Sequence, residues 1–77
     1  MKIKFQSVEG DKFFRYDKYE FHATRQTQGY SLVVYEWYYV EDNYIANKCF
    51  SRRVPITWEM PSNIDRIRER IVEFISK

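Results

Sequence analysis

The stretch YSLVVYEWYYV, residues 30–40, decides the fold because it reads as a β-strand that is apolar on both sides. Alternate side chains of a strand point to opposite faces of its sheet. One face of this strand carries Val33, Tyr35, Trp37 and Tyr39. The other face carries Leu32, Val34, Tyr38 and Val40, with Glu36 among them. Neither face suits water along its whole length, so we expect one to contact the core and the other a partner, a ligand or a second sheet.

The length of the chain, 77 residues, is enough for one domain. A domain this small buries only about 60% of the surface of its unfolded chain, so it often needs a disulfide, a metal or self-association. Cys49 is the only cysteine and His22 the only histidine, which excludes an internal disulfide and argues against structural zinc. Self-association remains, and we expect a homodimer.

One unpaired thiol fits a reducing, cytoplasmic setting. The sequence contains no signal-peptide pattern and no long apolar run, so no membrane span is expected. The formal net charge of +2 is too small to indicate nucleic acid by itself. The aromatic fraction of 19% favours a packed domain and supplies rings on which other rings can stack.

Apolar residues at strand spacing continue on both sides of the aromatic stretch. We expect strands over residues 2–8, 12–24, 30–41 and 44–54. Within the second of these, Phe13, Tyr19, Phe21 and Ala23 share one parity, and Phe14 and Tyr16 share the other. The change near Asp17 and Lys18 indicates a bulge or a break between two strands. Turns or loops are expected at Gly10 and over residues 25–29 and 41–43, and Pro55 should end the last strand or place it at an edge.

The spacing of apolar residues becomes helical after Pro61. The helical positions are Ile64, Ile67, Ile71, Phe74 and Ile75. Ser62 is the predicted N-cap, and Asp65 three residues later forms a weak capping box. Arg68 falls inside the apolar arc. Either its stem packs while the guanidinium reaches water, or it forms a partly buried ion pair or contacts an anion.

Strands joined by short loops favour antiparallel neighbours, and the helix comes last. The sequence therefore predicts an α+β domain: an antiparallel meander of four or five strands with one C-terminal amphipathic helix packed on one face. The opposite face is then the interaction surface by elimination.

The residues that catalysis needs are scarce in this chain. Its two glycines cannot form a glycine-rich phosphate loop. Cys49 and His22 are the one nucleophile and base, and they fall on separate predicted strands; we expect a structural cysteine and a histidine at the surface or a strand edge. The adjacent carboxylates Glu41 and Asp42 fit a solvated turn better than a metal site. We expect no enzyme, no cofactor and no metal.

Basic residues alternate with aromatic ones on the predicted strands. Arg15, Lys18 and Arg25 precede the aromatic strand, and Lys48, Arg52 and Arg53 follow it. Single-stranded nucleic acid binds such surfaces, with cations near its phosphates and bases stacked on rings at about 1–3 kcal/mol per base. The candidate nucleic-acid-binding residues are Arg15, Arg25, Tyr35, Trp37, Tyr39, Lys48, Arg52 and Arg53. A structural interpretation is open too, in which the aromatics form core and the cations protect strand edges.

The order of elements resembles that of the small homodimeric single-stranded-DNA-binding domains related to the eukaryotic transcriptional coactivator positive cofactor four. The likeness covers residues 19–75 and rests on Tyr35-Glu36-Trp37-Tyr38-Tyr39, a turn, residues 49–56 and a proline-containing entry to the helix. It implies phosphate contacts from Lys48, Arg52 and Arg53, stacking on Trp37 or Tyr39, and helices that pack together in a dimer. The Lys-Gly step typical of that family is replaced by residues 52–56, which contain no glycine, and the strand over residues 2–8 is not part of its pattern.

Two other interpretations fit the same features. Small size, near-balanced charge, no catalytic motif and an uncovered aromatic face are also typical of a protein-interaction module, such as a phage or mobile-element protein that masks a host enzyme. In the third interpretation, the second aromatic face serves only to form a homodimer.

Overall fold

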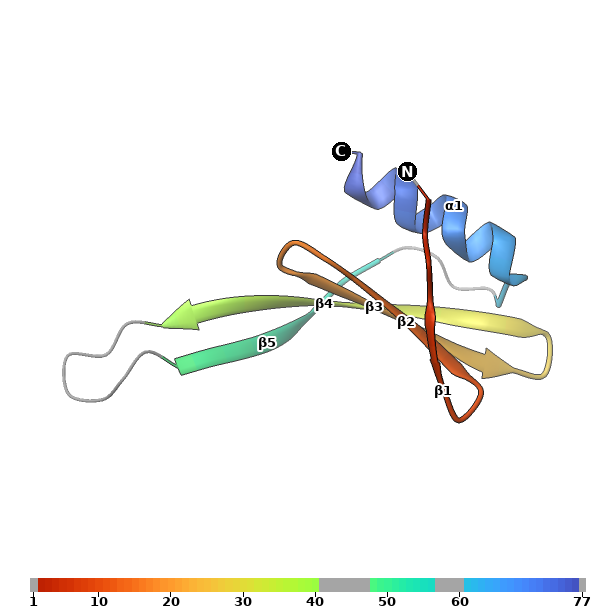
Figure 1. The fold of residues 1–77 in the computed structure, drawn as a ribbon, viewed down its shortest axis with the longest axis horizontal. Helices are drawn as coiled ribbons and strands as arrows, with labels where there is room; N and C mark the ends of the chain where they lie inside the picture. The colour runs from red at the N-terminus through yellow and green to blue at the C-terminus, as the bar shows by residue number, and fades with distance from the viewer. Residues whose placement is uncertain (1, 41–47, 57–60, 77) are drawn as a thin grey trace.

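The computed structural model describes residues 2–40, 48–56 and 61–76. These residues form, in order, β1 (Gln6–Val8), β2 (Asp11–Tyr16), β3 (Tyr19–Gln26), β4 (Gly29–Val40), β5 (Lys48–Val54) and α1 (Ile64–Ile75). Each strand pairs antiparallel with the next along the chain, so the sheet is a meander. α1 crosses one face of this sheet (Figure 1). The predicted α+β meander with a C-terminal helix is confirmed.

The predicted strand boundaries agree with the structure at most positions, but the loop expected over residues 25–29 is shorter, because β3 extends to Gln26 and β4 begins at Gly29. The first strand begins at Gln6 rather than at residue 2, and the break expected near Asp17 and Lys18 is a tight turn in which Asp17 has a positive φ of 55°. β5 ends at Val54, directly before Pro55, as predicted. The turn expected at residues 41–43 and the beginning of the strand expected over 44–54 lie outside the described residues.

The core lies between the sheet and α1. Its buried side chains are those of Ile3, Phe21, Ala23, Leu32, Val34, Ile67 and Ile71. Phe74 of α1 packs edge-on against Tyr19 and Phe21, with ring centroids 5.0 and 5.6 Å apart. The predicted helical spacing is confirmed, because the two buried residues of α1 are one turn apart. The structure describes no helix that is both long enough and apolar enough to cross a membrane.

The start of α1 differs from the prediction by one residue. The N-cap is Asn63, whose side-chain oxygen accepts a hydrogen bond from the backbone N–H of Arg66 at 2.9 Å. Ser62, the predicted cap, instead bridges to β4: the Tyr30 N–H donates to the Ser62 carbonyl at 2.7 Å, and the Ser62 N–H donates back at 2.9 Å. This bridge holds the entry to α1 against the start of β4, so the helix begins one residue later than the local pattern predicts.

Arg68 combines a ring contact with an ion pair. Its guanidinium lies 5.2 Å from the centre of the Phe5 ring, and its Nη1 donates to Asp65 Oδ1 at 2.8 Å. The Arg68 side chain is 40% exposed and that of Asp65 is 85% exposed. The ion pair therefore lies at the surface. This agrees with the predicted alternative in which the guanidinium reaches water, and not with a partly buried ion pair.

β4 continues beyond α1 and, with β5, forms an arm, which we define as residues 37–40 of β4 and residues 48–51 of β5. Figure 1 shows this pair of strands extending away from the part of the sheet that α1 covers. At the base of the arm the Trp37 N–H donates to the Lys18 carbonyl at 2.7 Å, and beyond it the described residues of β4 pair with β5 alone, with no helix above them. The two faces of β4 are therefore covered differently along its length.

Candidate nucleic-acid interface

The sheet face opposite α1, which we call the open face, carries the aromatic residues that the sequence singled out. Its main side chains are those of Phe13, Arg15, Glu20, His22, Tyr35, Trp37, Tyr39 and Arg53. Tyr35 and Trp37 are half-buried by their neighbours in the sheet, and Tyr39 is 76% exposed. On the other face of β4, Leu32 and Val34 are buried against α1. The predicted division of the strand into two apolar faces is confirmed.

A row of rings runs across three strands of the open face. Phe13 of β2 lies beside His22 of β3, with ring centroids 6.2 Å apart and planes 24° from parallel. His22 meets Tyr35 of β4 edge-on at 5.2 Å. Arg53 of β5 stands directly across from Tyr35 in the ladder. The row therefore ends beside a cation on the edge strand.

Trp37 is held in a defined orientation by polar neighbours. Its Nε1 donates a hydrogen bond to Glu20 Oε2 at 3.0 Å, and the same oxygen lies 3.7 Å from His22 Nε2. The Arg15 guanidinium carbon lies 5.7 Å from the centre of the indole ring, within the range of a cation–π contact. An indole fixed in this way loses little side-chain entropy when another ring stacks on it.

A hollow of about 360 Å³ lies at the β1 side of the sheet, and two of its lining residues, Arg15 and Glu20, contact Trp37. Its lining consists of Lys4, Gln6, Phe13, Phe14, Arg15 and Glu20. Lys4 and Arg15 give it two cations, and Glu20 gives it one carboxylate. The hollow thus combines positive charge with aromatic surface.

Five of the eight candidate residues from the sequence share the open face: Arg15, Tyr35, Trp37, Tyr39 and Arg53. The other three do not join them. Arg25 is exposed near the end of β3, on the side that carries Phe21 and Ala23. Arg52 lies on the α1 side of β5, and Lys48 stands opposite Val40 at the arm, where its side chain lies outside the described residues.

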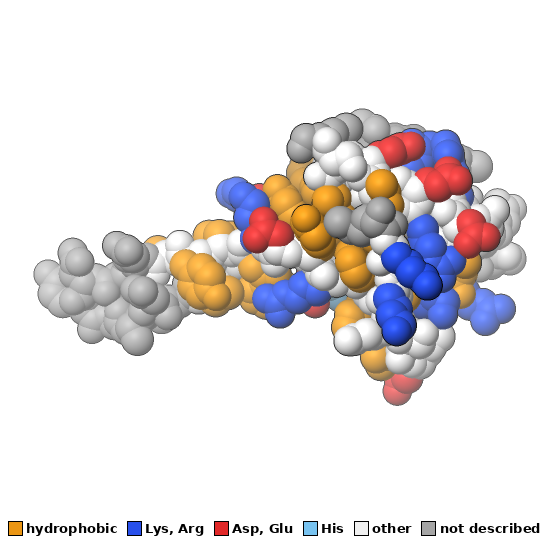
Figure 2. All heavy atoms as spheres, turned by 45° about the horizontal axis from the view of Figure 1, so that its top comes forward, with side chains coloured by type: hydrophobic (Ala, Val, Ile, Leu, Met, Phe, Trp, Pro, Cys, Tyr) orange, Lys and Arg blue, Asp and Glu red, His pale blue; other side chains and the backbone are white. Residues whose placement is uncertain are grey.

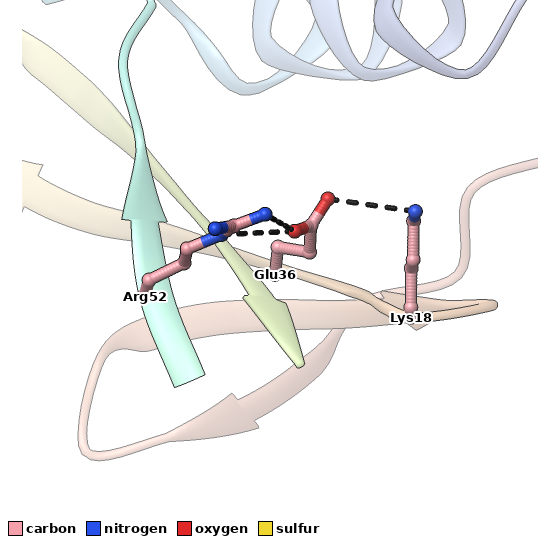
Figure 3. A network of polar contacts seen from close by, with 3 residues as sticks. All are labelled: Lys18, Glu36 and Arg52. Atoms are coloured by element: carbon pink, nitrogen blue, oxygen red, sulfur yellow. Dashed lines mark hydrogen bonds and ion pairs between the residues drawn. The ribbon is translucent and has the colours of Figure 1, made fainter. Parts of the chain in front are cut away.

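Arg52 is engaged in an ion network with Glu36 and Lys18 (Figure 3). Its Nε and Nη2 donate to Glu36 Oε1 at 3.0 and 2.5 Å, and Lys18 Nζ lies 3.6 Å from Oε2. The hydrogen bonds from Arg52 lower the pKa of Glu36, against the opposing effect of burial. The same bonds raise the pKa of Arg52. Because Arg52 is already paired with a carboxylate, binding of a phosphate to it would have to compete with Glu36.

The sequence missed three open-face residues, Phe13, Glu20 and His22. The two-residue turn at Asp17 and Lys18 pairs Phe13 with His22, so even positions of β3 share a face with odd positions of β2. Phe13 and Phe21 therefore lie on opposite faces although they share parity. Pairing residues outward from a two-residue turn at Asp17 and Lys18 sets Phe13 opposite His22 and Arg15 opposite Glu20. This pairing could have been worked out from the sequence and would have placed all three residues on the open face.

The α1 side of the arm also exposes apolar side chains. Tyr38 is 37% exposed, and Val40 and Phe50 are each 43% exposed. The rings of Tyr38 and Phe50 stack at 5.9 Å, and the Arg52 guanidinium lies 5.1 Å from the centre of the Tyr38 ring. Figure 2 shows hydrophobic side chains along the arm and charged ones over α1. Exposed apolar surface is therefore not confined to the face opposite α1, as predicted by elimination, because both faces of the arm are open.

Comparisons with protein-family models, curated proteins and solved structures found no match to this chain. Among the described residues, no three His, Cys, Asp or Glu side chains are grouped so that they could hold a metal ion. The open face offers the rings of Tyr35, Trp37 and Tyr39 for stacking and the guanidinium groups of Arg15 and Arg53 for pairing with anions.

Proposed function

We propose that this chain is a single-stranded nucleic-acid-binding module whose contact surface is the open face. The observation that carries the proposal is the fixed indole of Trp37 beside the Arg15 guanidinium, on a face where Tyr39 is exposed. Nonspecific single-strand binders combine these two parts, with cations along the backbone and rings under the bases.

The distribution of charge indicates a path for the phosphates. Arg15 and Lys4 lie on the β1 side of the aromatic row, and Arg53 lies on the β5 side. Glu20 stands between them and would repel a phosphate, but its Oε2 already accepts the Trp37 N–H. We expect phosphates to contact the flanking cations while bases occupy the rings between them.

Single strands are favoured over duplex because the faces of paired bases are hidden in the helical stack. Only an unpaired base can lie flat on Tyr35, Trp37 or Tyr39. The resemblance to the positive-cofactor-four domains supports the same class of ligand. It also implies contacts from Lys48, Arg52 and Arg53; of these we retain Arg53, since Arg52 is paired with Glu36.

The test is fluorescence anisotropy with a labelled oligothymidine of about 12 nucleotides, a length within the usual site sizes of such modules. Titrations at about 50 and 200 mM salt should show affinity that falls with salt, because phosphate contacts release counterions. With two or three phosphate contacts, log K should change with log salt at a slope of about −1.4 to −2. The same strand in a duplex should bind more weakly. No binding below about 100 μM at low salt would overturn the proposal.

Variants assign the binding face. Trp37→Ala should weaken binding about 5- to 150-fold, the loss expected for one stacked base. Arg15→Gln should reduce the salt slope by about 0.7. Arg66→Gln is the matched control, since Arg66 is exposed on α1 and pairs with Glu69 at 2.6 Å. Equal losses from Arg15→Gln and Arg66→Gln would show that the open face is not the contact surface. Circular dichroism checks that each variant folds.

A protein-interaction module, such as one that masks a host enzyme, is the second candidate. The exposed apolar residues on the arm favour it, because aromatic side chains often dominate protein interfaces. A partner captured from a bacterial lysate after nuclease treatment, and lost with Trp37→Ala, would favour this function. Loss of every partner on nuclease treatment would favour nucleic acid.

A further inference from the structure

The two edges of the sheet differ in length and in exposed apolar surface. β1 spans three residues, whereas β5 spans seven and has no further strand on its outer side within the described residues. A long free edge presents unpaired N–H and C=O groups to any other strand, and short edges are a common protection against this. Of the two edges, β5 is the one that can pair with a partner along a full strand.

The exposed apolar residues also concentrate next to β5. Of the six large hydrophobic side chains that are exposed in the described part of the chain, four lie on the arm: Tyr38, Tyr39, Val40 and Phe50. They stand on both faces of the arm, so no single surface contact would cover them all. A strand added to the β5 edge would add side chains beside both faces at once.

We propose that the partner of this edge is a second copy of the chain, whose β5 pairs antiparallel with this one about a two-fold axis at Ser51. The product is one continuous sheet of ten strands. This inference goes beyond the proposed function and needs no nucleic acid.

The sequence of β5 is self-complementary in this register. With Ser51 on the axis, Phe50 faces the partner's Arg52, Cys49 faces the partner's Arg53, and Lys48 faces the partner's Val54. No two cations are then directly opposite, and all seven residues pair. Like charges directly opposite in a ladder are destabilising, whereas a ring opposite a cation is favourable.

The neighbouring symmetric registers place like charges together. An axis at Phe50 sets Lys48 against the partner's Arg52, and an axis at Arg52 sets two copies of Arg52 against each other. A two-fold axis that passes between two residues of β5 would set a side chain on the α1 face directly opposite one on the open face. Such a register is excluded, because a two-fold axis perpendicular to the sheet keeps each side chain on its own face. Of the registers centred on Phe50, Ser51 and Arg52, the charges of the strand therefore select the one centred on Ser51.

The contact nearest the two-fold axis, between a guanidinium and an aromatic ring, is of a kind that the single chain already makes. Within one chain, the Arg52 guanidinium lies 5.1 Å from the centre of the Tyr38 ring, and its side chain is 65% exposed. In the dimer, the same guanidinium stands beside the partner's Phe50, which already stacks on its own Tyr38. The two-fold keeps both helices on one side, so the two open faces become contiguous.

Disulfide cross-linking tests the register. Residues directly opposite in an antiparallel ladder have Cα atoms about 4.5–5.5 Å apart, within the range that a disulfide spans. The double variant Ser51→Cys, Cys49→Ser should therefore form a covalent dimer quickly with oxidised glutathione. The unaltered chain is the matched control, because its two Cys49 residues would lie four positions apart along the ladder, about 13 Å. If Cys49 cross-links as fast as the double variant, the register is wrong.

Sedimentation velocity over a range of concentrations tests the pairing itself, with two variants at one position. Phe50→Glu and Phe50→Lys both remove the ring, but only the lysine places a cation against the partner's Arg52. We expect a concentration-dependent dimer for the unaltered chain, with Phe50→Lys dissociating at least about tenfold more readily than Phe50→Glu. A chain that remains monomeric up to about 1 mM, or two variants with equal dimer affinity, would overturn the proposal. Because nucleic acid is absent, neither result depends on the proposed binding function.

Discussion

The two ends of β4 carry similar side chains in different surroundings. On the α1 side, Leu32 is 7% exposed and Val34 is fully buried, while farther along the same face Tyr38 and Val40 are 37% and 43% exposed. The alternation of apolar residues is the same throughout. What differs is the presence of α1 above the first half of the strand (Figure 1). An apolar alternation therefore identifies a strand without showing what covers it.

The two ends also differ in how they are held. At its start, β4 is joined to the entry of α1 by two backbone hydrogen bonds between Tyr30 and Ser62. At the base of the arm, Trp37 bonds to Lys18 and Glu20. Beyond Trp37 the described contacts of β4 are the β5 ladder and the side-chain contacts of Tyr38 with Phe50 and Arg52. We infer that stability comes from the first end and that the second end is available for partners.

The largest effect should come from truncating the same residue type in the two regions. Phe21 is fully buried under α1, and Phe50 is 43% exposed on the arm. Phe21→Ala should lower the free energy of unfolding by about 3–5 kcal/mol, enough to unfold much of a small domain. Phe50→Ala should cost about 1 kcal/mol or less. Urea unfolding followed by circular dichroism at low protein concentration measures both losses. Equal losses would remove the distinction between the arm and the part of the sheet that α1 covers.

A smaller effect should come from the junction of β4 with α1. Gly29 has a φ of 130°, and a Cβ added there would lie 2.6 Å from the carbonyl oxygen of Ser62. Gly29→Ala should therefore cost about 2 kcal/mol or more, from backbone strain together with displacement of the bridge. Gly10 also has a positive φ, of 87°, but nothing lies within 4 Å of its added Cβ.

The comparison of these two glycines separates the clash from the strain. Gly10→Ala should show strain alone, about 1 kcal/mol, by the same unfolding measurement. If Gly29→Ala cost no more than Gly10→Ala, the bridge to Ser62 would have no role in holding the first end of β4.

Much of the fold was predictable because its determinants are local in the chain. The two faces of β4 and the helical spacing of Ile67 and Ile71 follow from alternation and from the 3.6-residue period, each read within one element. The turn at Asp17 and Lys18 appeared as a change of parity between neighbouring aromatics. For the site, this local information was enough to place Tyr35, Trp37 and Tyr39 on one face.

The rest depends on contacts between elements. Ser62 has the side chain of a good N-cap, but its backbone pairs with Tyr30, so Asn63 takes the cap. Arg52 and Arg53 are adjacent in the sequence, and only the pairing of β4 with β5 decides that Arg53 shares a face with Trp37. That pairing is a contact between two elements, and the periodicity within either strand does not reveal its register. The exposure of Tyr38 and Phe50 likewise follows from where α1 ends.

The smallest effect should come from the boundary between the two regions, where Glu36 stands between the buried Val34 and the exposed Tyr38. The hydrogen bonds from Arg52 lower the pKa of Glu36 in the folded chain, so the unfolded chain binds the proton more tightly. The resulting stabilisation is present above the unfolded carboxyl pKa and is lost as pH falls below about 4, through the folded value. It should be modest, because Arg52 and Lys18 are 65% and 53% exposed and water screens the pair.

Urea midpoints at about pH 6 and pH 3 measure this loss when the unaltered chain is compared with Glu36→Gln. The glutamine variant should be less stable at the higher pH and should lose less stability on acidification, since it has no carboxylate to protonate. Glu69→Gln is the control, because Glu69 is 60% exposed and pairs with Arg66 on α1, away from this boundary. If Glu36→Gln kept the full acid dependence of the unaltered chain, the network in Figure 3 would add nothing to the folded state. Among the described contacts, the arm would then be held to the rest of the sheet by the strand ladder and by the hydrogen bonds of Trp37 to Lys18 and Glu20.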